Sequence, residues 1–257
     1  MKKDILIGAV AILIILGGVL FYATTKPSPA KAPAPIDITT LTGGNYTEHT
    51  AYYDIEASYA SSTPLLALVS AETDAAAITK MKKFVDDTIT QFKNDGNFAN
   101  LTAEDIQVMG FDKGRKEKLQ IMYLIAPAVR TVSYVFTVYT DTLGAHGNTS
   151  FRTFTFDTKT GAELSLADVF LPNARYLEAL SSLSRARLPG VIGRNADMSF
   201  IEPGTTPESK SFEDFFFNGS DFVLLFAPYA VAPYSEGPQT LRIPVTDLAS
   251  TLKTEYR

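Results

Sequence analysis

The sequence contains no cysteine, no tryptophan and only two histidines, His49 and His146. Without cysteine the chain forms no disulfide, no thiolate metal site and no cysteine nucleophile, and it carries no cysteine-linked lipid. Zinc hydrolases commonly place two or three histidines on one metal ion, and two widely separated histidines fit that pattern poorly. The composition therefore argues against a metal centre.

Several motifs that would carry chemistry are missing as well. There is no phosphate-binding glycine loop, no serine nucleophile elbow and no His-Glu-x-x-His segment. The net charge of −5 and an isoelectric point near 5.1 argue against nucleic-acid binding, which needs a basic face. We therefore expect no cofactor, no metal and no catalytic residue, and we expect that the protein is not an enzyme.

What the sequence does contain is typical of a folded chain rich in strands. Apolar residues make up 46% of its 257 residues, and 17 phenylalanines and 12 tyrosines supply all its aromatic rings. Aromatic residues of both kinds favour β-strands. Composition alone thus indicates a globular protein and leaves its function open.

The N-terminus carries an uncharged apolar run at residues 5–22. Eighteen helical residues rise about 27 Å, close to the ~30 Å hydrocarbon core of a membrane. Lys2 and Lys3 precede the run, so the positive-inside rule places the stub at residues 1–4 in the cytoplasm. A cleaved signal peptide is the alternative, but its apolar region is usually shorter, about 7–15 residues. We predict a single-pass signal-anchor in the cell membrane with the C-terminal part extracytoplasmic.

A proline-rich linker is expected next, at residues 23–45. Four prolines fall within nine residues, from Pro27 to Pro35. Such a segment favours an extended polyproline conformation, so it would act as a spacer.

The remainder alternates strand patterns with isolated amphipathic helices, of which residues 73–93 are the longest. This order predicts an α+β fold with mostly antiparallel sheets and packed helices. We expect a small strand–helix domain at residues 46–115 and a larger C-terminal α+β domain at residues 116–257. Asn218 to Asp221 predict a hairpin turn between two phenylalanine-rich strands.

Three residues are candidates for ligand binding: His146, Tyr229 and Tyr234. His146 lies between glycines in Gly144-Ala145-His146-Gly147, which permits close backbone approach. It is either a base beside Asp141 or Asp157, a ligand contact, or a turn residue bonded to the backbone. Tyr229 and Tyr234 stand among three prolines in a rigid loop, which either recognises a partner or packs on a sheet.

Carboxylates are plentiful, in Asp86-Asp87, Glu213-Asp214, Asp197 and Glu202. A glycosidase needs two facing carboxylates about 5–9 Å apart, which the sequence does not establish. We interpret each as part of a solvated face, and we also place His49 at the surface.

Three motif blocks together resemble one family of bacterial extracytoplasmic domains. They are Gly144-Ala145-His146-Gly147, then Phe154-Thr155-Phe156-Asp157 with Thr160-Gly161 and Asp168-Val169-Phe170, and finally Phe226-x-Pro228-Tyr229-x-Val231-Ala232-Pro233-Tyr234 with Gly237. The family is a domain of unknown function found in the ectodomain of lysozyme-sensing RsiV-type anti-sigma factors and in the accessory region of PdaC-type peptidoglycan deacetylases. Residues 46–125 resemble the smaller domain that precedes it there.

The resemblance implies a membrane-tethered binding domain that recognises a lysozyme-like envelope protein or peptidoglycan. Residues 45–257 hold 19 basic and 26 acidic residues, and this net charge of −7 would favour a cationic partner such as a lysozyme. The four residues before the apolar run are expected to be too few for sigma-factor binding, and the deacetylase motifs are missing. The alternative is an enzyme acting on envelope glycan with His146 and a carboxylate.

Overall fold

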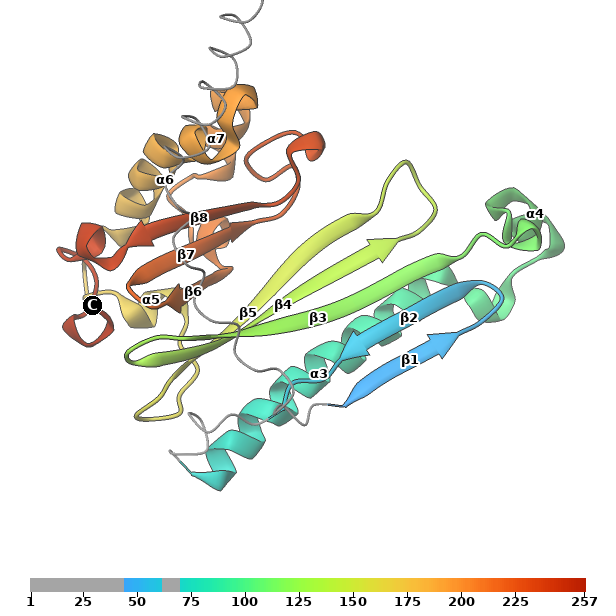
Figure 1. Ribbon diagram of the computed structural model, residues 1–257, viewed down its shortest axis with the longest axis horizontal. Coiled ribbons are helices and arrows are strands. Elements are labelled where there is room, and N and C mark those ends of the chain that lie inside the picture. The colour runs from blue at the N-terminus through green and yellow to red at the C-terminus, as the bar shows by residue number, and fades with distance from the viewer. Residues whose placement is uncertain (1–43, 62–69) are drawn as a thin grey trace, which may run out of the picture. The chain divides into compact units, whose positions relative to one another are not determined.

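A computed structural model describes residues 44–61 and 70–257 (Figure 1). The predicted stub at residues 1–4 and the predicted anchor at residues 5–22 lie outside this range. So does the predicted linker at 23–45, except for its last two residues. Within the described ranges no helix is long and apolar enough to cross a membrane.

The first sheet has five strands in the order β1-β2-β3-β4-β5. They are β1 (Asn45–His49), β2 (Tyr53–Ser58), β3 (Glu117–Pro127), β4 (Thr131–Asp141) and β5 (Asn148–Asp157). All neighbours are antiparallel except β2 and β3. The antiparallel β3–β4–β5 meander is the long green and yellow part of Figure 1.

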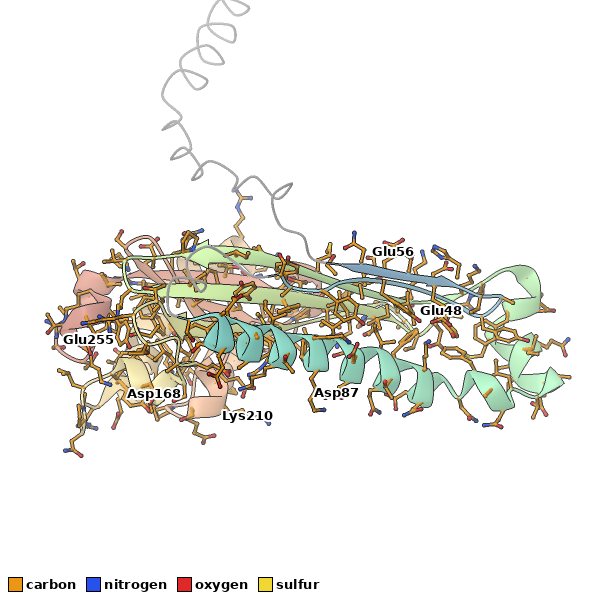
Figure 2. All side chains as sticks on the ribbon, turned by 90° about the horizontal axis from the view of Figure 1, so that it is seen from below. Glu48, Glu56, Asp87, Asp168, Lys210 and Glu255 are labelled. Atoms are coloured by element: carbon orange, nitrogen blue, oxygen red, sulfur yellow. The ribbon has the colours of Figure 1, made fainter. Side chains whose placement is uncertain are left out.

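One face of this sheet is covered by α3 (Ala71–Gly96), the predicted amphipathic helix (Figure 2). The Ser70 side chain accepts a hydrogen bond from the Thr73 backbone N–H and begins the helix. One face of the helix is buried, and its residues recur with the spacing of helical turns: Ala77, Met81, Val85, Ile89 and Phe92. They pack on alternate residues of the strands, because side chains along a strand point to opposite faces.

The parallel pairing of β2 with β3 requires a long connection, which α3 and α4 (Ala103–Met109) supply. A capping box between Thr102 and Asp105 begins α4, a helix that the sequence analysis did not predict. The boundary predicted between residues 115 and 116 falls inside this sheet, since β2 and β3 pair across it.

The second sheet contains β6 (Phe215–Asn218), β7 (Asp221–Phe226) and β8 (Gln239–Pro244), all antiparallel. The predicted hairpin between β6 and β7 is confirmed. Strands β6 and β7 are buried on both faces, which explains their unbroken apolar runs, whereas β8 alternates between buried and exposed residues. One face packs with helix α6 (Tyr176–Ile192) in the larger core, and the other meets the first sheet. The α+β class with mostly antiparallel sheets and packed helices is therefore confirmed.

Three details of the C-terminal half differ from expectation. Asparagine commonly caps helices, so the sequence favours a helix that begins after Asn173, but Asn173 adopts a left-handed φ of 61° and the helix begins at Tyr176. The prolines and glycines of residues 189–211 indicate a loop, but this stretch contains the end of α6 and a further helix, α7 (Met198–Gly204). Thr246 favours a short C-terminal helix, but 3₁₀ turns take its place.

The remaining elements are short. They are α5 (Leu166–Val169) and 3₁₀ turns at Phe98–Asn100, Phe111–Lys113, Gly193–Asn195, Ser209–Phe212, Tyr234–Glu236, Val245–Leu248 and Thr254–Tyr256.

The two sheets touch through a small apolar seam at one end of the β3–β4–β5 meander. Ala126 and Val135 of the first sheet pack with Phe216 and Val223 of the second. The Thr155 hydroxyl also donates a hydrogen bond to the Phe215 carbonyl at 3.3 Å. The seam thus fixes where the hairpin of β4 and β5 stands relative to the second sheet.

Asp157 ties the C-terminus to the end of β5. This residue is only 2% exposed, and its carboxylate accepts hydrogen bonds from Arg130 (2.8 Å) and the Tyr256 hydroxyl (3.0 Å). It also accepts bonds from the backbone N–H groups of Lys159 and Thr160, at 2.8 and 2.9 Å. Burial alone would raise the pKa of Asp157, but these donors together lower it.

We predict that Asp157→Ala lowers the free energy of unfolding by about 2–4 kcal/mol, because it leaves Arg130 and Tyr256 without their acceptor. Urea denaturation measures the change. Asp87→Ala, which removes an exposed carboxylate paired with Lys83, is the matched control and should cost less than about 0.5 kcal/mol. Equal stability of the two variants would show that the network around Asp157 contributes nothing to the fold.

Candidate functional site

The structure brings the three candidate binding residues together in one cluster. His146 lies in the turn between β4 and β5, whereas Tyr229 and Tyr234 lie in the loop between β7 and β8, which projects toward that turn in Figure 1. The His146 ring stacks on Tyr234 with centroids 3.6 Å apart and planes at 18°. Its Nε2 lies 3.2 Å from the Tyr229 hydroxyl, and the two tyrosine rings are 5.6 Å apart. We call these three residues the aromatic cluster.

The hydrogen bonds of the aromatic cluster indicate which ring nitrogen of the neutral His146 carries the proton. Nδ1 lies 2.9 Å from the Gly147 carbonyl, which only accepts, so Nδ1 carries the proton. In the neutral ring Nε2 then accepts the hydrogen bond that the Tyr229 hydroxyl donates. The Tyr234 hydroxyl donates to the same Gly147 carbonyl at 2.7 Å. One backbone oxygen therefore orients both stacked rings.

The turn that carries His146 is held from several sides. Leu143 adopts a left-handed φ of 62°, its N–H donates to Asp141 Oδ1, and its carbonyl accepts a bond from Arg115. Gly147 is buried, and a Cβ at this position would stand 2.2 Å from the Tyr139 hydroxyl. A side chain at Gly147 would thus push the turn away from its place beside Tyr234.

The loop that carries the tyrosines is anchored in the larger core by Val231 and Ala232, which are both buried. The backbone at Ala230 lies so close to α7 that a Cβ on Gly204 would fall 1.8 Å from its carbonyl oxygen. Tyr229 nevertheless remains 56% exposed and adopts a left-handed φ of 69°. A non-glycine residue in this conformation stores strain, which commonly marks a functional position.

Of the alternatives for His146, the structure shows the turn residue bonded to the backbone and not the base beside Asp141 or Asp157. The Asp141 carboxylate accepts a hydrogen bond from the Leu143 backbone N–H, and the Asp157 carboxylate accepts one from Arg130. Within residues 44–61 and 70–257, neither nitrogen of His146 bonds to a carboxylate. His49 lies on the exposed part of the first sheet as expected, with Nδ1 3.0 Å from Asp54.

The aromatic cluster offers ring surface and hydrogen-bonding atoms without a fixed charge. Exposed aromatic rings pack against apolar faces, and their polar tips bond to hydroxyl groups. No group of three or more residues suited to hold a metal ion occurs in the described ranges. The cluster therefore presents ring faces, two tyrosine hydroxyls and an imidazole at the surface of the described part of the chain.

We predict that Gly147→Ala disturbs the aromatic cluster and lowers stability by about 1–2 kcal/mol, because the added methyl group displaces Tyr139. Gly144→Ala is the matched control, since a Cβ there meets nothing within 4 Å. Thermal unfolding and the NMR signals of the His146 ring measure the two effects. Identical behaviour of both variants would contradict this description of the turn.

A pocket of about 680 Å³ is a second candidate site, which sequence reasoning missed. Its lining comes from four segments of the chain: Lys80 on α3; Arg152, Thr153 and Thr155 on β5; residues 163–168; and Ser209, Lys210, Glu213 and Phe215 before and in β6. Figure 2 shows Asp168 and Lys210 near one another on the side of the molecule where α3 lies. No short motif joins these segments in the sequence, so only the fold reveals the pocket.

Asp214, beside this pocket, is not part of a solvated face as the sequence analysis expected. Burial, followed by repulsion from Glu213, raises the pKa of Asp214 to about 6, against smaller opposing effects of the Thr153 N–H and Arg152. Its position next to the apolar run at Phe215 was the available signal for burial. Asp87 is exposed as expected, in an ion pair with Lys83 (Figure 2).

We predict that Asp214 contributes a loss of stability as the pH rises from about 4 to 6, because folded Asp214 holds its proton more tightly than the unfolded chain does. Asp214→Asn should remove this loss. It should be about 1–3 kcal/mol more stable than wild type at pH 7.5 and equal to it near pH 4. Chemical denaturation across this range tests the difference, with Asp87→Asn as control; parallel profiles of wild type and Asp214→Asn would contradict it.

Comparison with known proteins identifies a family domain in part of this chain. The family model "Protein of unknown function (DUF3298)" matches residues 167–246. This part of the chain is a DUF3298 domain. The domain contains Tyr229, Tyr234 and Asp214, whereas His146 and Arg152 lie before the matched range. Both candidate sites therefore combine the DUF3298 domain with the first sheet.

A longer similarity joins the chain to the peptidoglycan-N-acetylmuramic acid deacetylase PdaC of Bacillus subtilis. The two are 30% identical over 177 residues, which are 68% of this chain and 36% of PdaC. The chain thus spans about a third of the length of this curated relative. The predicted resemblance to PdaC-type deacetylases and to a domain family of unknown function is confirmed.

Two solved structures are similar in fold. A DUF3298-family protein from Bacteroides fragilis matches 84% of this chain and 93% of its own at 18% identity, with a TM-score of 0.50. A second from Pseudomonas aeruginosa matches 84% and 96% at 14% identity, with a TM-score of 0.48. The first shows that the fold itself occurs in this family.

Proposed function

We propose that this protein is a non-catalytic, extracytoplasmic binding domain that recognises peptidoglycan through its aromatic cluster. The observation that carries the proposal is the backbone of Tyr229, which is strained while its side chain remains largely in solvent. A tyrosine in a left-handed conformation costs stability, and an exposed ring returns little of that cost. The benefit of this conformation is then contact between the Tyr229 ring and a partner.

The relationship to PdaC supports the choice of partner. That protein is by name a deacetylase of peptidoglycan N-acetylmuramic acid, and this chain matches 36% of it. We propose that the matched part serves PdaC as an accessory region and that it has the same kind of target in both proteins. Sugar rings have apolar C–H faces and many hydroxyls, which suit exposed tyrosines.

The hydrogen bonds of His146 favour binding over the alternative of glycan chemistry. A general base needs a free lone pair within reach of the substrate proton. In the aromatic cluster the Nε2 lone pair of His146 already accepts the Tyr229 hydroxyl. The proposed tether is the predicted membrane anchor at residues 5–22, which would hold the domain in the cell envelope.

We predict that the full chain co-sediments with insoluble peptidoglycan. Tyr229→Ala and His146→Ala should each lower the affinity for peptidoglycan at least fivefold. The fivefold loss corresponds to about 1 kcal/mol, the value of one stacked or hydrogen-bonded contact. Met122→Ala is the matched control, because Met122 is 55% exposed and lies on β3, outside the aromatic cluster. It should bind as wild type does.

A parallel measurement with lysozyme separates the two partners that the sequence suggests. The net charge of −7 on residues 45–257 would attract a cationic protein at low salt. Binding of lysozyme but not of peptidoglycan would overturn the proposed target, and binding of neither would overturn the proposed function. Turnover of peptidoglycan fragments that disappears in His146→Ala would favour the enzyme instead.

A further inference from the structure

The pocket beside Asp214 has the features of a built binding site independent of the aromatic cluster. Its volume of about 680 Å³ lies within the usual range for small-molecule sites. Three cations line it, Lys80, Arg152 and Lys210, although the chain as a whole is acidic. They come from α3, β5 and the 3₁₀ turn before β6, so tertiary structure alone brings them together.

Two of the three carboxylates of the lining already have partners within the protein. Glu163 forms ion pairs with Lys80 and, at 3.8 Å, with Arg152. Asp168 accepts hydrogen bonds from both the backbone N–H and the hydroxyl of Ser165, as the capping box of α5. Both carboxylates are therefore held in place by contacts within the protein.

Arg152 and Lys210, in contrast, keep unused donors. The Arg152 guanidinium packs 4.7 Å from the centre of the Phe154 ring, and its nearest carboxylate oxygen, on Glu163, is 3.8 Å away. That distance is too long for a hydrogen bond. Within the described parts of the chain Lys210 has no ion-pair partner. A guanidinium that lies over an aromatic ring keeps its N–H donors, which can make a two-point contact with a carboxylate.

We infer that this pocket binds a small carboxylate ligand, whose carboxylate is held by Arg152 and Lys210. Glu213 on the rim would accept a hydroxyl or amide N–H of the same ligand, so the site suits a molecule that carries both groups. Peptidoglycan offers two such sources: the lactyl carboxylate of N-acetylmuramic acid and the carboxylate of its peptides. The inference rests on the proposed function only for this choice of probes.

Ligand-observed NMR titration of the full chain tests the inference with three probes. N-acetylmuramic acid and N-acetylglucosamine differ by the lactyl group that carries the carboxylate, and the dipeptide Ala-Ala represents the peptide source. We expect N-acetylmuramic acid or the dipeptide to bind saturably and at least tenfold more tightly than N-acetylglucosamine. Whichever of the two binds more tightly identifies the source.

Variants connect that binding to the pocket. Arg152→Gln should weaken binding of the carboxylate probe at least tenfold, and Lys210→Gln should weaken it at least threefold. Lys83→Gln should leave the affinity for the probe unchanged. Lys83 is the matched control, because it is an exposed lysine of α3 outside the pocket. Lys210 is itself exposed, so its replacement leaves folding intact even if Arg152→Gln unfolds the chain.

Equal binding of all three probes, or saturable binding of none, would overturn the inference. So would wild-type affinity in both Lys210→Gln and a folded Arg152→Gln. These outcomes are distinguishable from failure of the proposed function, because peptidoglycan co-sedimentation that depends on Tyr229 would persist without the pocket.

Discussion

The position of both candidate sites depends on the apolar seam between the two sheets. Ala126 and Val135 meet Phe216 and Val223 at one end of the β3–β4–β5 meander. Because strands are stiff over their paired length, this contact also determines where the far end of the β4–β5 hairpin stands. His146 lies at that far end. The pocket lined by Arg152 and Lys210 lies beside the same contact, where β5 approaches β6.

The two ends of the β4–β5 hairpin differ in the kind of contacts that they make. At the seam apolar side chains pack beside the buried hydroxyl of Thr155, and Asp157 adds a buried network that includes Tyr256 near the C-terminus. At the tip, contact is made by exposed aromatic rings around one carbonyl oxygen. The seam therefore stabilises the fold, whereas the tip supplies surface that a partner can reach.

Much of this arrangement could be predicted from local sequence patterns. The helix at 73–93 and the hairpin around Asn218 to Asp221 follow from periodicity and turn residues, and both are present. His146, Tyr229 and Tyr234 stood out because glycines and prolines flank them, and the fold unites them. The turn residue and the ligand contact were alternatives for His146, and the geometry allows both, since its ring bonds to the backbone and to Tyr229.

Other features required the tertiary structure. The parallel pairing of β2 with β3 has no local signal, since it joins strands separated by two helices. The partial burial of Asp214 and the convergence of Lys80, Arg152 and Lys210 arise only when α3 and the second sheet approach β5. Asn173 looked like a helix cap, but its left-handed backbone places it before the helix instead.

The variant Tyr229→Gly separates a strained backbone that is retained for binding from one that the fold itself requires. Glycine adopts the left-handed conformation without strain, so the account predicts unchanged or slightly higher stability, by up to about 1 kcal/mol, together with loss of peptidoglycan binding. Parallel denaturation and co-sedimentation of this one variant measure both quantities. A Tyr229→Gly protein that is clearly less stable, or that still binds peptidoglycan as wild type does, would contradict the account.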